Sequence, residues 1–343
     1  MKAIQFSEHG EAGVLQLVDV PKPTPHGNDV LVHVAFAGIN RVDIWVRKGG
    51  PAYPVSLPHI LGADGAGVVE ECGPEAEGVS TGNRVVIIPA LSCGTCGFCL
   101  KGMDNQCEQF EILGAKRQGT YGEYVLVPDQ NVVPIPDSLP FDKAAAFPLA
   151  YLTAWHMLTS RAKLQPKEKI LIVGASAGVA VAAIQIAKWR GATVLAATTD
   201  KAKIEKIKTL QPDDVFCEEE GKDLFKWIHK KTNGHGVDVV FEHVGPATWE
   251  KSIKSLGKYG RLVTCGGTSG PSVQIDLRTL FSRDMSILGA RMGTQREFQE
   301  LAQLVFEGKI DPVIDKIFPL AEAAGAHAHI ESRQQFGKVL LKI

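Results

Sequence analysis

The sequence predicts an α/β protein of two domains, in which a β-rich domain precedes a doubly wound parallel-sheet domain. Three observations support this prediction. Strand-like alternation fills the first third of the chain, strands and helices alternate regularly from Lys169 to about Ala290, and a proline-rich stretch at 128–140 separates the two patterns. At 343 residues the chain is also long enough for two domains.

Composition and charge argue against several classes of function. Hydrophobic residues make up 45% and charged residues 22% of the chain, as in ordinary globular proteins. The formal net charge is −1 and no basic stripe is present, so we expect neither a nucleic-acid partner nor a membrane partner. No apolar run reaches the ~18 residues of a membrane span. We therefore expect a cytoplasmic protein whose thiols are reduced.

The first 60 residues alternate apolar and polar side chains at the period of a β-strand. Alternate residues from Val30 to Phe36 share one face, and prolines and glycines at 21–28 provide turns. We expect further short strands at 66–71, 84–88 and 121–127. Residues 142–160 then have a helical pattern.

The second part of the chain has the periodicity of a parallel sheet crossed by helices. We expect its strands at 170–173, 192–198, 214–217, 237–241, 260–264 and 286–290. In the tail we expect helices near 295–307 and 321–330 and strands at 314–318 and 338–343. The last strand has no partner in the six-strand series, so we expect it to return to the first domain. The predicted domains are therefore 1–130 with 293–343, and 131–292.

Four of the seven cysteines form a compact motif, Cys93-x2-Cys96-x2-Cys99-x7-Cys107. The two-residue gaps allow one loop to turn its thiolates toward a shared tetrahedral ion. Four thiolates leave no position for water or substrate, so the motif indicates a structural zinc. An iron–sulfur cluster and four unrelated buried thiols are the alternatives, and the setting favours zinc.

A β-rich first domain, this cysteine lobe, a nucleotide-binding sheet and a returning tail together resemble the zinc-type medium-chain dehydrogenase/reductase superfamily. The superfamily includes alcohol dehydrogenases and quinone oxidoreductases. The similarity extends to Gly62–Gly67 (GADGAG), Gly119–Val125 (GTYGEYV) and 152–154. The resemblance implies a GroES-like catalytic domain with a zinc lobe at about 91–110. It also implies a Rossmann domain, with NAD or NADP bound between the two.

The sequence departs from the zinc alcohol dehydrogenases at the positions that hold their second, catalytic zinc. By resemblance, the Cys position is Asn40, the His-Glu pair is Ala63 with Asp64, and the remaining Cys or acidic ligand is Leu149. The hydroxyl that relays a proton is replaced by Val42. Asparagine is a poor zinc ligand, and alanine and leucine cannot ligate. We therefore predict that the catalytic zinc is absent.

The asparagine at position 40 resembles the pattern of the quinone oxidoreductase branch of the superfamily. In that branch, hydride passes from NADPH to a conjugated carbonyl without a metal. A hydrogen-bond donor must then stabilise charge on the substrate oxygen. Asn40 is the preferred donor and Tyr53 the alternative; Asn40 could instead merely end a strand. Asp43 and Asp64 would lie behind the site, where they could bind an adventitious ion with His59.

Three functions remain open. The first is an NAD(P)H-dependent reductase of a quinone or enone, a small carbonyl substrate, without catalytic zinc. The second is a zinc alcohol dehydrogenase that recruits unexpected ligands. The third is a cofactor-binding protein without catalysis.

The βαβ unit at 169–203 carries the candidate cofactor site. Its small-residue turn precedes a helix whose first N–H groups can bind a phosphate. The glycine fingerprint is incomplete, because aligned by resemblance it reads Ala-Ser-Ala-Gly-Val-Ala from 175 to 180. The cofactor candidates in this turn are Ser176, Ala177, Gly178 and Val179.

The end of the second strand of this unit distinguishes NADP from NAD. NAD enzymes place an acidic residue there, which binds the ribose 2′-hydroxyl and repels a 2′-phosphate. This chain has Thr198 and Thr199, and Lys203 could face a phosphate, although it could equally be a solvated helix residue. Asp200 is better interpreted as a helix N-cap. The pattern favours NADP, with NAD as the alternative.

The resemblance implies further cofactor contacts. They are Arg41, Thr153, Val244, Gly245, Gly266 and Lys338. The strand at 286–290 falls at the edge of the sheet, where members of the superfamily commonly pair across a two-fold axis. We therefore expect a homodimer, with a homotetramer as the alternative.

Overall fold

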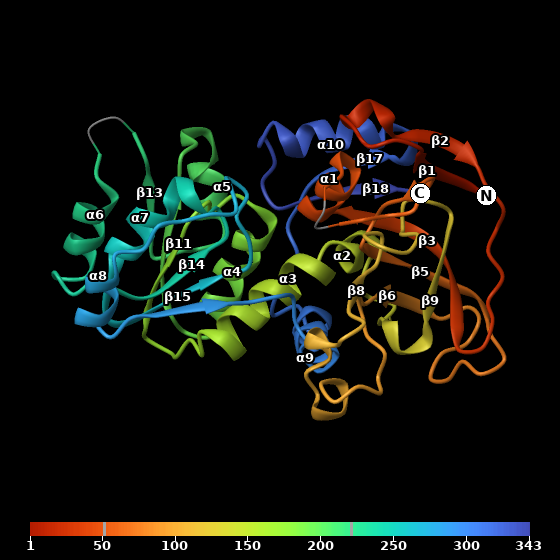
Figure 1. Ribbon diagram of the computed structural model, residues 1–343, viewed down its shortest axis with the longest axis horizontal. Coiled ribbons are helices and arrows are strands. Elements are labelled where there is room, and N and C mark those ends of the chain that lie inside the picture. The colour runs from red at the N-terminus through yellow and green to blue at the C-terminus, as the bar shows by residue number, and fades with distance from the viewer. Residues whose placement is uncertain (51–52, 220–221) are drawn as a thin grey trace. The chain divides into compact units, whose positions relative to one another are not determined.

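The computed structural model describes residues 1–50, 53–219 and 222–343 (Figure 1). The chain forms two compact units, Met1–Ala150 with Thr294–Ile343, and Tyr151–Gly293. The first junction lies within helix α3 (Pro148–Trp155), later than the boundary at residue 130 expected from the sequence. The reason is that β10 (Val132–Pro134) pairs with β6 (Arg84–Ile87), which keeps the proline-rich segment in the first unit.

The largest sheet of the first unit has the strand order β10–β6–β5–β3–β18–β17, and β9 also pairs with β3. Its remaining strands are β3 (Asp29–Ile39), β5 (Asp64–Cys72), β9 (Tyr124–Pro128), β17 (Ile314–Pro319) and β18 (Lys338–Lys342). The last strand of the chain therefore lies antiparallel to β3, with Val339 opposite Ile39. This pairing brings the C-terminal segment beside the end of β3.

Two smaller sheets complete the strands described in this unit, with the orders β2–β1–β4 and β7–β8. Their strands are β1 (Lys2–Phe6), β2 (Gln16–Asp19), β4 (His59–Ile60), β7 (Ala90–Leu91) and β8 (Glu111–Ile112). The helices of the unit are α1 (Arg41–Lys48), α2 (Phe141–Ala145), α9 (Gln295–Phe306) and α10 (Ala323–Glu331). Val30, Val32 and Val34 enter the core from one face of β3, and Leu31 is buried on the other.

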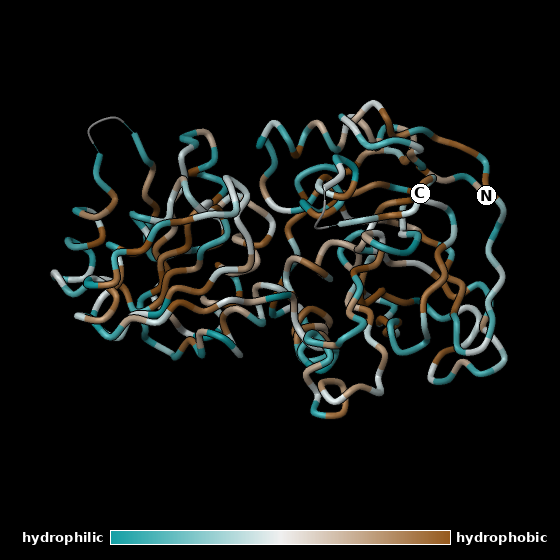
Figure 2. Tube along the Cα trace, viewed as in Figure 1, coloured by the Kyte–Doolittle hydropathy of each residue, from teal (hydrophilic) through white to brown (hydrophobic). Residues whose placement is uncertain are grey.

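The second unit is a six-stranded parallel sheet with the order β13–β12–β11–β14–β15–β16. Its strands are β11 (Lys169–Ile172), β12 (Thr193–Thr198), β13 (Asp214–Cys217), β14 (Val237–Glu242), β15 (Leu256–Thr264) and β16 (Ser286–Gly289). Figure 2 shows apolar residues along these strands, as expected for a sheet covered on both faces. The predicted fold class, a GroES-like β domain with a Rossmann domain, is confirmed.

Helices connect the strands of this sheet. They are α4 (Gly178–Trp189), α5 (Ile204–Lys208), α6 (Leu224–Lys231), α7 (Pro246–Ser255) and α8 (Leu277–Ser282). The helical pattern expected at 142–160 divides into α2, α3 and a π-helical turn, His156–Arg161. Pro148 explains the first break, because proline can begin a helix but cannot continue one. Among the described helices, none has both the length and the hydropathy of a membrane span.

Candidate functional site

A buried polar network lies where β3, β5 and β18 meet in the first unit. Asn40 follows β3 directly and is the N-cap of α1, and Asp64 begins β5. Gly38 pairs with Asp64 across the two strands. A Cβ at Gly38 would lie 2.9 Å from the Asp64 Cβ, so glycine permits this close approach. The topology thus joins two predicted site residues that are 24 positions apart in the sequence.

Lys338 completes this network from the far end of the chain. Its Nζ donates to the Ile39 carbonyl (3.0 Å), to Asn40 Oδ1 (2.6 Å) and to Asp64 Oδ2 (2.8 Å). The side chain is 3% exposed. An ammonium group has three N–H bonds, and all three are used here. A direct bond between this ammonium and a cofactor, as expected from the resemblance, would therefore have to replace one of them.

The two carboxylates of the network are held by backbone N–H groups. Asp43 accepts from Asn40 N at 2.7 Å and from Gly62 N at 3.1 Å, and Asp64 accepts from Leu149 N at 2.8 Å. Burial raises the pKa of Asp43 to about 7, although the Asn40 N–H opposes this rise. Asn40, Asp64 and Leu149, three of the positions compared with zinc ligands, therefore lie together.

A second set of buried groups, which the sequence did not indicate, adjoins Asp43. Burial and then the negative charge of Asp43 raise the pKa of Tyr121 well above its ordinary value. The Tyr121 hydroxyl lies 3.2 Å from His327 Nε2, and Arg47 Nη1 lies 3.2 Å from His327 Nδ1. Because arginine only donates, Nδ1 accepts and Nε2 carries the proton. Arg47 also pairs with Glu331 at 2.9 Å.

Tyr53 and His59 have other surroundings. Tyr53 stacks on Trp45 of α1, with ring centroids 6.0 Å apart. His59 Nε2 lies 3.0 Å from the Gly114 carbonyl, and burial lowers the pKa of this histidine. Within residues 1–50, 53–219 and 222–343, the four cysteines are the only group of three or more Cys, His, Asp and Glu residues placed to hold one ion. His59 and the two carboxylates of the network do not form such a group.

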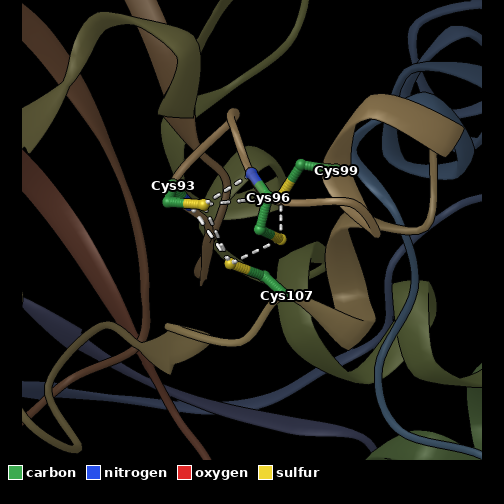
Figure 3. Close-up of side chains that lie close together, drawn as sticks. All are labelled: Cys93, Cys96, Cys99 and Cys107. Carbon is green, nitrogen blue, oxygen red and sulfur yellow. Dashed lines mark hydrogen bonds between the residues drawn. The ribbon is translucent and has the colours of Figure 1, made fainter.

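The four predicted metal ligands lie together at the end of the lobe between β7 and β8 (Figure 3). Neighbouring Sγ atoms are 3.5 to 3.9 Å apart. Ligands bound at about 2.3 Å around a tetrahedral zinc would be about 3.8 Å apart. These thiolates therefore fit a structural zinc.

Local hydrogen bonds prepare this cluster for a cation. Backbone and hydroxyl groups of Thr95 lower the pKa of Cys93 to about 6, which favours the thiolate that a metal needs. Burial and the neighbouring thiols raise the pKa of Cys99 to about 12. A divalent cation among the four sulfurs would offset that cost, because it stabilises every thiolate at once.

The small-residue turn in the second unit adopts the predicted strand–turn–helix arrangement. Gly174 has φ +60°, and a Cβ there would lie 3.0 Å from His243 Nε2. The N-cap of α4 is Ala177, which offers no side-chain cap. The first N–H groups of α4, beginning at Gly178 and Val179, are therefore suited to a phosphate.

The residues expected to distinguish NADP from NAD lie next to this turn. Lys203 is 8% exposed, so it is not a solvated helix residue. Its Nζ lies 3.4 Å from Ser176 Oγ and 3.7 Å from an Asp200 carboxylate oxygen. Asp200 accepts from Ala202 N at 2.9 Å, which is the predicted N-cap. Thr198, also buried, ends β12 and its Oγ1 accepts from Asp200 N at 3.1 Å. Thr199 is exposed.

Glu242 organises the turn after β14, and no motif in the sequence indicates this role. Its buried carboxylate accepts from the N–H groups of Val244 (2.7 Å) and Gly245 (3.1 Å). The hydroxyls of Thr248 and Ser252 also donate to it. The carboxylate thus fixes the backbone at two predicted cofactor contacts.

The remaining predicted cofactor contacts occur in both units. Arg41 is the first residue of α1, and burial, followed by the charge of Arg333, lowers its pKa. Thr153 is buried within α3. Gly266 follows β15, and its carbonyl accepts from Thr264 Oγ1 at 3.2 Å.

Comparisons with known proteins agree with this fold. Residues 26–137 match the alcohol dehydrogenase GroES-like domain, and residues 178–307 match the zinc-binding dehydrogenase domain. The chain is 31% identical to the NAD-dependent alcohol dehydrogenase of Sulfolobus acidocaldarius, over 100% of both chains. It is 30% identical to the quinone oxidoreductase of Rattus norvegicus, over 99% of this chain and 97% of that one. The crystal structure of an NAD-dependent alcohol dehydrogenase has a TM-score of 0.96 and 41% identity, covering 100% of each chain.

A GroES-like domain with a four-cysteine lobe suited to a structural zinc, combined with a Rossmann sheet suited to a nicotinamide cofactor, defines an oxidoreductase. The chain belongs to the zinc-type medium-chain dehydrogenase/reductase superfamily, as the resemblance implied.

Proposed function

We propose that the protein is an NADPH-dependent reductase of quinones or enones that works without a catalytic zinc. The observation that carries this proposal is the residue set at the end of β3, just before β5 and in the first turn of α3. Asn40, Ala63 and Leu149 stand at positions that hold zinc ligands in the alcohol dehydrogenases of the superfamily, and none of them suits zinc. Asn40 and Asp64 bond instead to the Lys338 ammonium.

The reaction requires a donor for the charge that develops on the substrate oxygen. When bound, a reduced nicotinamide supplies a hydride, and negative charge then grows on the oxygen of the conjugated carbonyl. We assign the Asn40 side-chain amide as the donor to that oxygen, with the Tyr53 hydroxyl as the alternative. Water supplies the proton that completes the reduction.

The choice of NADP over NAD rests on the residues at the end of β12 and just after it. Thr198 and Thr199 replace the acidic residue that would repel a 2′-phosphate. Lys203 supplies a positive charge beside Ser176 in the phosphate-binding turn. The names of two relatives, both NAD-dependent alcohol dehydrogenases, favour NAD instead.

Those same names support a second candidate, a zinc alcohol dehydrogenase that interconverts alcohols with aldehydes or ketones. In this case the catalytic metal would need ligands other than those of the superfamily. A third candidate is a cofactor-binding protein without catalysis, which the missing ligand set also permits.

Substrate and cofactor panels separate these candidates. Oxidation of NADPH and of NADH is followed with quinones, enones and aldehydes, and alcohol oxidation is followed with both oxidised cofactors. We expect turnover of a quinone or enone with a higher kcat/KM for NADPH than for NADH. Turnover confined to alcohols and aldehydes would support the second candidate. Cofactor binding without turnover on any panel would support the third.

We also propose that the protein is a cytoplasmic homodimer assembled through β16. This strand ends the sheet order, and α8 nearby exposes Leu277 (67%) and Phe281 (69%). An unpaired strand edge beside exposed apolar side chains suits a symmetric contact. Reduced thiols at the zinc cluster suit the cytoplasm.

A further inference from the structure

Lys338 bonds to Asn40, the donor in the proposed reaction, and to Asp64 behind it. Ile39 opposite Val339 in the sheet sets Lys338 beside Asn40. The ammonium then donates to the side-chain oxygen Oδ1 of Asn40 at 2.6 Å and to Asp64 Oδ2 at 2.8 Å. The pair lies out of water, since the Lys338 and Asp64 side chains are 3% and 0% exposed. Electrostatic interactions are strong in such a setting.

This contact and the Asp64 carboxylate together determine which way the Asn40 amide faces. A lysine ammonium only donates, so the atom next to it must be Oδ1. Nδ2 then faces Asp64 Oδ2 at 2.9 Å and uses one of its two hydrogens there. The other lies toward the Gly38 carbonyl at 3.5 Å, beyond the ordinary hydrogen-bond range. One N–H of Asn40 is therefore available for a stronger acceptor.

The same contact controls the charge behind Asn40. Asp64 is a buried carboxylate, and a second negative charge on a substrate oxygen near Asn40 would be repelled by it. The Lys338 ammonium at 2.8 Å neutralises this carboxylate. Without Lys338, one of the two contacts that orient the amide is lost and the Asp64 carboxylate is left without its cation.

We propose that Lys338 is a positioning residue that acts through Asn40: it fixes the amide with an N–H toward the substrate oxygen and neutralises Asp64. A protein cation thus balances the charge at a centre where the zinc alcohol dehydrogenases use a metal. This inference rests on the proposed function, because it requires Asn40 to be the donor in a metal-independent reduction.

A double-mutant cycle tests the inference on the full-length protein. Lys338→Met keeps length and removes charge, Asn40→Ala removes the donor, and Lys338→Arg restores a cation. We expect Lys338→Met to lower kcat for enone reduction about 10- to 100-fold with less than a threefold change in KM for NADPH, and Lys338→Arg to recover part of the loss. In an Asn40→Ala background we expect Lys338→Met to cost less than about twofold. Exposed Lys342 on the same strand provides the control, Lys342→Met.

Any one of three outcomes overturns the inference. Equal losses from Lys338→Met in the wild-type and Asn40→Ala backgrounds would show that Lys338 does not act through Asn40, and so would unchanged activity in a folded Lys338→Met protein. If Lys338→Met does not fold, Asp64→Asn is compared with Lys338→Met/Asp64→Asn, where both buried charges are gone. The orientation of Asn40 then predicts at least a fivefold further loss in kcat, and equal kcat values contradict it. A wild-type protein that reduces no quinone or enone would instead overturn the proposed function.

Discussion

The polar side chains buried behind Asn40 include more acidic groups than basic groups. Asp43, Asp64 and Lys338 are each at most 3% exposed, so two carboxylates share one ammonium. Burial raises the pKa of Asp43 to about 7, the Asn40 N–H lowers it, and the nearby Asp64 carboxylate raises it. Lys338 and the Gly62 N–H oppose the rise. Between about pH 4 and about pH 7, Asp43 therefore keeps its proton in the folded protein, whereas an unfolded aspartate has lost it.

This shift predicts a pH-dependent stability difference between the wild type and Asp43→Asn. Between about pH 4 and about pH 7 the folded state binds a proton that the unfolded state releases. The stabilising contribution of Asp43 is therefore complete below about pH 4 and is lost as the pH rises through about 7. We expect wild type to lose a few kcal/mol relative to Asp43→Asn across this range, measured by urea unfolding.

The free energies of unfolding of wild type and Asp43→Asn must be subtracted, because His327 changes stability with pH in the opposite direction. Burial and the adjacent Arg47 lower the pKa of His327 to about 3, so its contribution to stability rises with pH up to about 6.5. Both proteins contain His327, and its effect cancels in the difference. A difference that stays constant from pH 4 to pH 7 would contradict the raised pKa of Asp43.

A single side chain also carries the predicted cofactor preference. Lys203 places its ammonium beside Ser176, where a 2′-phosphate would be bound. We expect Lys203→Ala to raise KM for NADPH about 10- to 100-fold and to change KM for NADH less than threefold. Steady-state kinetics with both cofactors checks this. Lys201→Ala is the matched control, since Lys201 is 81% exposed. Equal effects on the two cofactors would assign Lys203 to another role.

Asn40 and Asp64 could be predicted from the sequence as candidate site residues, but their surroundings could not. Both lie in short motifs whose spacing is characteristic of the superfamily. Arg47 has no such signal: it lies on a short helix, where an exposed position is the ordinary expectation. It is buried, and one of its partners is His327, 280 residues away. Glu242 could not be predicted either, because backbone N–H groups point toward its carboxylate only after the turn has folded.

Among the elements, the cysteine lobe depends most directly on a bound ion. Two short 3₁₀ turns and the strands β7 and β8 support it, so the thiolates hold much of its structure together. We expect wild type to contain one zinc per chain, and Cys96→Ser to lose it and to unfold several degrees lower. Atomic emission and thermal unfolding measure the two effects. Cys72→Ser, outside the cluster, should retain the zinc; full zinc content in Cys96→Ser would contradict the assignment.

The parallel strands were predictable because each is a short apolar run with clear ends. All six occur, and most boundaries agree within one residue. The exception is β15, which begins at Leu256 because its first residues pair beside Val237 before the main register starts. Such an irregularity depends on a neighbouring strand, and the local sequence does not contain it.

For the assembled protein, we expect a dimer of the 37.0 kDa chain. We expect Phe281→Glu to weaken the dimer by at least tenfold, because a carboxylate would be buried in an apolar contact. Sedimentation equilibrium measures the change. Leu100→Glu in the zinc lobe, where Leu100 is 77% exposed, is the control and should not alter assembly. A monomeric wild type, or a Phe281→Glu dimer of unchanged affinity, would contradict the β16 interface.

The chain order of the whole molecule was the hardest feature to derive from local patterns. The tail strand β18 was expected to return to the first domain only because the parallel series had no place for it. Its pairing with β3 places Lys338 against Asn40. No periodicity in the sequence indicates which residue of the tail arrives there.

We propose that the protein reduces its quinone or enone substrate without any metal beyond the cysteine-bound zinc. The most direct measurement is NADPH-dependent quinone or enone turnover before and after treatment with a chelator, with zinc per chain determined on the same samples. We expect undiminished turnover at one zinc per chain. The metal-free mechanism would be contradicted if turnover falls when the chelator removes a second zinc and returns when that zinc is restored.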